Sequence, residues 1–204
     1  MSVGKSLWWA GRSLRVFLAG LLGGVSAIAI VNPATMAQSG PMIEECNQFA
    51  TGVNRHREVM NSFEAEIATF AENAVAAETL AEITAAASQY VDAAGDITAS
   101  LKTVASDLDT LSLTDTQLTN YRDEYVVLVA GFSTALTTVS DAMAQVAASE
   151  TEDQLSDSLQ AVGEETTITI DEIETLAIEE SAIIDEVNAY CTSEPGQDLG
   201  RAVN

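Results

Sequence analysis

His56 and Glu180 are the two residues whose positions raise the question of chemistry, because each interrupts an otherwise apolar helical repeat. His56 is the single histidine of the chain, so any histidine-based acid–base or metal chemistry would depend on it. A di-iron bundle requires repeated Glu-x-x-His motifs, and a haem attachment requires Cys-x-x-Cys-His. Neither motif is present, and nothing presents a nucleophile elbow for a serine triad. We therefore expect no enzyme activity, no cofactor and no dedicated metal site.

The chain has two cysteines, Cys46 and Cys191, which lie too far apart in sequence for a Cys-x-x-Cys redox motif. Both fall on apolar helical seams near opposite ends of the main segment. An oxidising compartment would favour their pairing in a disulfide, which would also remove them as zinc ligands. The alternative is two free thiols.

Carboxylates repeat every seven residues near the C-terminus, at Glu165, Glu172, Glu179 and Glu186. Such spacing forms an acidic stripe on one face of a helix. The simplest interpretation is a solvated face. The alternatives are weak binding of divalent cations and docking of a basic partner, because stacked carboxylates attract cations.

Composition separates a basic beginning from an acidic remainder. Over 204 residues the formal net charge is -23, and all 31 acidic residues follow Ala37. Hydrophobic residues make up 47% of the chain, which is enough for a packed core and argues against a disordered acidic tail. Nucleic acid is excluded as a partner, since phosphate binding requires clustered Lys and Arg.

Residues 42–194 contain no proline and are rich in alanine, which favours long helices. Apolar residues recur at alternating steps of three and four, the heptad pattern of packed helices. The pattern slips beside Thr79 and Glu82, which read as a capping box, and further turns are expected at Thr114 with Gln117 and at Thr151 with Gln154. The sequence predicts an all-α, antiparallel up-down-up-down four-helix bundle. Residues 163–170 are the weak point of the last helix, because Thr and Ile favour strands.

The predicted disulfide sets the relative height of the first and last helices. If Cys46 is level with Cys191 and these helices are antiparallel, His56 lies level with Ser181, one residue from Glu180. We therefore expect a hydrogen-bonded or ionic pair between His56 and Glu180, since either residue is costly to bury alone. The alternatives are that a side chain turns to the surface, or that Arg55 or Arg57 pairs with Glu180.

Each expected helix contains a glycine, although glycine costs about 1 kcal/mol relative to alanine inside a helix. Close helix packing is the simpler explanation. The alternative is a small central pocket lined by His56, Met60, Gly95 and Gly131.

The N-terminal segment has the form of a secretory signal peptide. Lys5, Arg12 and Arg15 precede an apolar run over 16–31, and a small-residue site ends at Ala37. We expect a signal peptide over 1–37, a short linker over 38–41, the bundle over 42–191 and a flexible tail over 192–204. The alternative is an uncleaved helix that anchors the protein to a membrane.

Two short motifs carry a family resemblance. Residues 111–125 read Leu-Ser-Leu-Thr-Asp-x-x-Leu-x-x-Tyr-Arg-x-x-Tyr, and residues 87–91 read Ala-Ser-Gln-Tyr-Val. With the signal peptide, this pattern resembles uncharacterised secreted helical proteins of cyanobacteria. The resemblance implies a periplasmic or extracellular setting and no catalytic residue.

Two classes of function fit these observations. The first is a secreted or periplasmic structural or interaction module with an unknown protein partner. The second is a ligand-binding or sensory bundle, by analogy with the four-helix periplasmic domains of chemoreceptors.

Overall fold

The computed structural model describes residues 41–192, and all of their regular structure is α-helical. The four helices are α2 (Pro41–Ala76), α3 (Leu80–Asp109), α4 (Thr116–Ala147) and α5 (Glu152–Thr192). The prediction of an all-α protein with four helices is confirmed. The expected signal peptide, the expected linker except Pro41 and the expected C-terminal tail except Thr192 lie outside the described residues, and Pro41 begins α2 while Thr192 ends α5.

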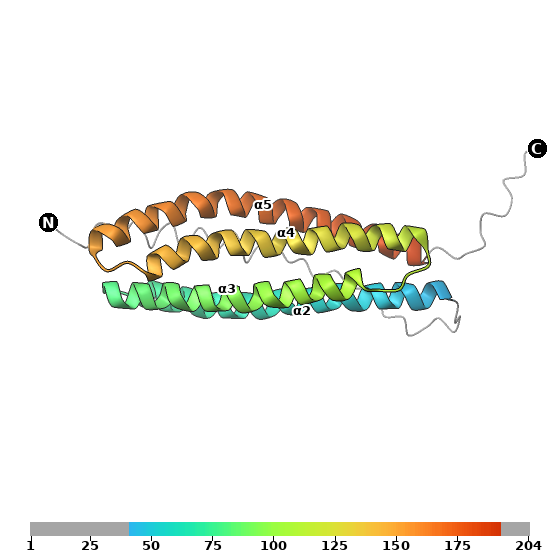
Figure 1. Cartoon of the computed structure of the whole chain (residues 1–204), viewed down its shortest axis with the longest axis horizontal. Helices are drawn as coiled ribbons and strands as arrows, with labels where there is room; N and C mark the ends of the chain where they lie inside the picture. Colours follow the sequence, from blue (N-terminus) through green and yellow to red (C-terminus); the bar gives the residue numbers. More distant parts are fainter. Residues whose placement is uncertain (1–40, 193–204) are drawn as a thin grey trace, which may run out of the picture.

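The four helices lie side by side in an elongated bundle (Figure 1). In this view α2 and α3 form the lower layer, and α4 and α5 the upper one. Contacts are most extensive between α3 and α4, and smaller between α4 and α5 and between α2 and α3. The first and last helices, α2 and α5, approach each other in only a few places, so each of these contacts matters for holding the two helices together.

The core follows the heptad seams. Each helix contributes apolar side chains at steps of three and four, which places them on one face. The largest side chains with less than 2% exposure include one histidine among aromatic and aliphatic residues: Phe49, His56, Ile67, Phe70, Tyr90, Leu101, Leu108, Leu118, Tyr125 and Leu136. A heptad pattern alone therefore located most of the core.

The first and third turns are capped as the sequence predicts. Thr79 accepts from the backbone N–H of Glu82, and Glu82 accepts from the backbone N–H of Thr79, which completes a capping box. At the third turn, the Thr151 hydroxyl accepts from the N–H of Gln154, whose side chain accepts from the N–H of Glu150. Both arrangements satisfy N–H groups that a helix start leaves unpaired.

At the second turn the predicted cap is wrong by one residue. Asp115, not Thr114, accepts from the N–H of Leu118 and caps α4. A carboxylate is a better acceptor than a hydroxyl at a helix N-terminus. Thr114 is bound instead by Glu45 of α2.

The helix α5 runs without a break through residues 163–170. Thr166 and Thr169 are buried there, and the Thr167 hydroxyl donates to the carbonyl of Gly163. Packing against the bundle thus overrides the β propensity of this stretch. In Figure 1 the middle of α5 bows away from α4.

Among residues 41–192, α4 is the one helix long and apolar enough to cross a membrane. Half of its most apolar stretch is buried inside the bundle, against α3 and α5. Its position at the centre of the core accounts for its composition.

Candidate functional site

The structure brings His56 and Glu180 together. Nδ1 of His56 on α2 lies 3.0 Å from Oε1 of Glu180 on α5. The His56 side chain is 1% exposed and that of Glu180 is 24% exposed, so the pair spans from the core to the edge of the bundle. This contact confirms the pair that we predicted by setting Cys46 level with Cys191.

A third residue, Tyr125 on α4, completes the cluster. Its hydroxyl donates to Oε1 of Glu180 over 2.5 Å and lies 2.9 Å from Nδ1 of His56. The sequence singled out Tyr125 only as the last residue of the 111–125 motif, and its polar role was missed. A tyrosine on a seam at the height of two other polar residues is the signal that could have found it.

His56, Tyr125 and Glu180 form a polar layer. Their hydrogen bonds indicate which of their atoms carry hydrogens. The Tyr125 hydroxyl donates its one hydrogen to Glu180, so both oxygens near Nδ1 of His56 can only accept from it. Nδ1 must therefore carry a hydrogen. Nδ1–H then donates to Glu180 and is shared with the Tyr125 oxygen. Nε2 of His56 is buried and has no hydrogen-bond partner within the described chain. The imidazole also packs against the rings of Tyr125 and Phe132, with centroids 5.7 and 5.4 Å away.

Electrostatics favour an ionised Glu180. Burial opposes the charge, but hydrogen bonds from His56 and Tyr125, the charge that His56 can carry and that of Arg57 together hold the pKa of Glu180 below its ordinary value of 4.5. Burial, followed by the negative charge of Glu180 and the hydrogen bond to it, raises the pKa of Tyr125 far above its ordinary value of 10.0. The layer therefore holds a carboxylate and a neutral phenol at neutral pH.

Arg55 and Arg57, the two arginines beside His56 in the chain, differ in whether they act on Glu180. Arg55, one of the alternative partners, pairs with Asp107 on α3 instead of with Glu180. Both members of that pair are about half exposed, so it contributes little stability. Arg57 is half-buried and acts on Glu180 through its charge.

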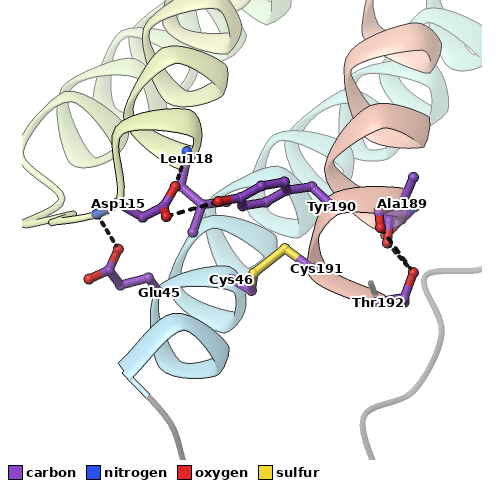
Figure 2. Close-up of a disulfide and its surroundings, with 9 residues drawn as sticks. Glu45, Cys46, Asp115, Leu118, Ala189, Tyr190, Cys191 and Thr192 are labelled. Carbon is purple, nitrogen blue, oxygen red and sulfur yellow. Dashed lines mark hydrogen bonds between the residues drawn. A yellow bond between two sulfur atoms is a disulfide. The ribbon is translucent and has the colours of Figure 1, made fainter. Parts of the chain in front are cut away.

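The second cluster lies at the end of the bundle where α2 begins and α5 ends. Cys46 and Cys191 form a disulfide with Cα atoms 6.1 Å apart, as the sequence predicts (Figure 2). The bridge closes 145 residues of chain. A disulfide is compatible with an extracytoplasmic location.

Glu45 precedes Cys46 and is buried, although it is charged. One carboxylate oxygen accepts from the backbone N–H and hydroxyl of Thr114, and the other accepts from the N–H of Asp115. These bonds, led by that from the Thr114 hydroxyl, hold the pKa of Glu45 below its ordinary value. Glu45 thus ties the start of α2 to the turn before α4, a role that sequence analysis missed.

Asp115 links the same turn to α5. Its side chain accepts from the N–H of Leu118 over 2.9 Å and from the hydroxyl of Tyr190 over 2.9 Å (Figure 2). Tyr190 lies next to Cys191 in the chain. The hydrogen bonds of Glu45 and Asp115 and the disulfide therefore join α2, α4 and α5 at one pole.

The structure does not bring the glycines of the candidate central pocket together with His56. Gly95 is exposed, and a Cβ there would meet no atom within 4 Å, so this residue faces solvent. Gly131 faces α5, where a Cβ would lie 2.8 Å from Leu176. His56 is enclosed by aromatic rings, and Met60 is half-buried. Close helix packing, the simpler explanation, holds for Gly131 and for Gly52, which is covered by Leu108.

A groove does exist on the outer face between α4 and α5. It is open, has a volume of about 630 Å³ and contains two members of the predicted acidic stripe among its lining residues: Gly131, Thr134, Ile168, Asp171, Glu172, Thr175, Leu176 and Glu179. Of the other stripe residues, Glu186 is exposed and Glu165 is half-buried. Within residues 41–192, no three His, Cys, Asp or Glu side chains are arranged to hold a metal ion.

Comparison with known protein families, with curated proteins and with solved structures finds no match. The resemblance to secreted helical proteins of cyanobacteria therefore stays a prediction.

Proposed function

We propose that this protein is a secreted or periplasmic interaction module, built as an antiparallel up-down-up-down bundle with an acidic exterior. The observation that carries the proposal is the disulfide between Cys46 and Cys191, which joins the first and last helices. Connections of three, six and four residues between consecutive helices support the topology, because short connections favour antiparallel neighbours.

The polar layer fits a structural role better than a catalytic one. His56, Tyr125 and Glu180 bond to one another, which fixes the relative heights of α2, α4 and α5. A buried polar contact of this kind favours one register over alternatives in which its members lack partners. We assign no reaction to it.

The charge of the exterior supports binding of a basic partner. Residues 41–192 contain 29 acids against four bases, and two of those bases, Arg55 and Arg122, pair with aspartates. Most carboxylates of residues 41–192 therefore face solvent without a cation of that segment beside them, and their field would attract a positively charged protein.

Carbodiimide cross-linking of the protein in its own host tests this proposal. The reagent couples carboxylates to amines, and Lys102 is the only lysine of residues 41–192, so most cross-links would reach the lysines of a partner. We expect a defined cross-linked complex with one protein, and native mass spectrometry of the disulfide-bonded chain should show no bound small molecule. A stoichiometric small ligand without a protein partner would instead support the ligand-binding alternative and contradict the proposal.

A further inference from the structure

The last helix, α5, has few buried side chains for its length. Six of its 41 residues are buried, against 13 of the 32 residues of α4. Two of those six are Thr166 and Thr169, whose buried hydroxyls have no hydrogen-bond partner within the described chain. An unpaired buried hydroxyl costs free energy, so these two residues hold α5 less firmly than apolar side chains of the same size would.

The charge of α5 adds a repulsion that opposes its packing. The helix contains 12 Asp and Glu residues and no Lys or Arg. Residues 41–151 contain 17 acidic and four basic residues, so the rest of the bundle is also negatively charged. The two parts therefore repel each other, and salt weakens this repulsion by screening the exposed charges.

The last turns of α5, residues 177–192, are held at a few identifiable points. Two apolar side chains of this terminal segment, Ile184 and Val187, lie in the core. Glu180 is hydrogen-bonded within the polar layer, and the Tyr190 hydroxyl donates to the cap of α4. These contacts are non-covalent, so the terminal segment depends strongly on its one disulfide (Figure 2).

The start of α2, at the other side of the disulfide, has anchors of its own. The Glu45 carboxylate accepts three hydrogen bonds from the turn before α4. One helical turn beyond the bridge, α2 also packs closely on α3, where Leu108 covers Gly52. Because α2 and α5 approach each other in only a few places, loss of the bridge frees the end of α5 and leaves α2 in position.

We infer that α5 is a redox-controlled latch: reduction of the disulfide between Cys46 and Cys191 releases residues 177–192, while α2, α3 and α4 keep their fold. Release brings Ile184 and Val187 into contact with solvent. The inference concerns control of the bundle and goes beyond the proposed interaction function. It does not depend on a particular partner, so a failed cross-linking experiment would leave it standing.

The reductant is a dithiol, which reacts by thiol–disulfide exchange. Cys191 is half-buried and Cys46 is buried, so Cys191 is the more exposed of the two. A thiolate of the reductant attacks the Cys191 sulfur, and the Cys46 sulfur leaves as a thiolate. The second thiol of the reductant then attacks the mixed disulfide and releases Cys191. The reductant gives up two electrons and two protons and becomes a disulfide, and the protein gains two thiols.

Hydrogen–deuterium exchange of the full chain, before and after reduction by dithiothreitol, tests the inference. We expect the backbone amides of residues 177–192 to exchange about tenfold faster after reduction, and those of residues 93–108 on α3 less than about twofold faster. Equal acceleration in all four helices would show that the whole bundle is destabilised. No acceleration in the terminal segment would show that its packing is sufficient to hold it. Either result would overturn the inference.

Two further measurements separate the bridge from the charge. C46S/C191S should show the fast exchange of residues 177–192 without reductant, and dithiothreitol should not accelerate it further. In the reduced protein, raising the NaCl concentration from about 0.02 M to about 0.5 M should slow this exchange about threefold relative to residues 93–108, because salt screens the repulsion. Slow exchange in C46S/C191S would overturn the latch, and an unchanged rate in high salt would overturn the role given to repulsion.

Discussion

Nδ1 of His56 lies 3.0 Å from Oε1 of Glu180, although 124 residues of sequence separate them. The Tyr125 hydroxyl touches both groups, so three helices share one buried polar contact. A contact of this kind is expensive to break from one side, because the remaining groups stay buried without partners.

Substitution of two members of the polar layer should therefore cost less than the sum of the two single substitutions. We expect His56→Leu and Glu180→Leu each to lower the free energy of unfolding by about 2 kcal/mol. The double variant should lose at least about 1 kcal/mol less than the sum of the single losses. Urea denaturation of the four proteins gives this coupling energy, and strictly additive losses would show that the two residues are independent.

The same contact should make stability depend on acidity. Because the pKa of Glu180 in the folded protein lies below its ordinary value of 4.5, its stabilising contribution is complete above that value. The contribution is then lost as the pH falls through the lower, folded pKa. Stability should therefore fall as the pH drops below about 4.5, and Glu180→Gln should reduce that fall. The control is Glu179→Gln, which alters an exposed neighbour, and an equal effect of both variants would contradict the assignment.

The disulfide should supply a large part of the stability. On a chain-entropy estimate, closing 145 residues contributes about 5 kcal/mol. We expect C46S/C191S, or reduction of the natural protein, to lower the denaturation midpoint strongly. The reductant should leave the midpoint of the double variant unchanged, whereas a fall there would indicate an effect unrelated to the bridge.

Glu45 should support the same end of the bundle without any covalent bond. Glu45→Gln removes the charge that accepts from Thr114 and Asp115, so it should lower the melting temperature. Glu44→Gln is a matched control, because Glu44 is the exposed neighbour. Equal melting temperatures for the two variants would contradict a capping role for Glu45.

Substitution of Gly95 and of Gly52 by alanine should change the stability of the protein in opposite directions. Gly95→Ala meets open space on an exposed helix, so it should stabilise the protein by about 1 kcal/mol. Gly52→Ala would place its Cβ against Leu108, which is buried, and should destabilise it by about 1 to 3 kcal/mol. Thermal unfolding distinguishes the two, and stabilisation by both would show that α2 and α3 do not pack closely at Gly52.

The heptad seams, the first and third turns and the disulfide could be predicted because each depends on residues close in sequence or on a single pairing. The partner of His56 could be predicted because the disulfide fixed the height of α5 against α2. The height of Tyr125 could have been predicted in the same way, but its hydrogen bonds and those of Glu45 could not, since they depend on the rotation of one helix against another. A one-dimensional repeat gives the height of a residue and leaves that rotation open.

We propose that the disulfide-closed bundle acts outside the cytoplasm, and thiol labelling of the protein recovered from its host tests this proposal. We expect Cys46 and Cys191 to resist alkylation before reduction and to accept the label afterwards, in the periplasmic or extracellular fraction. Alkylation of both cysteines without reduction, in the cytoplasmic fraction, would contradict it.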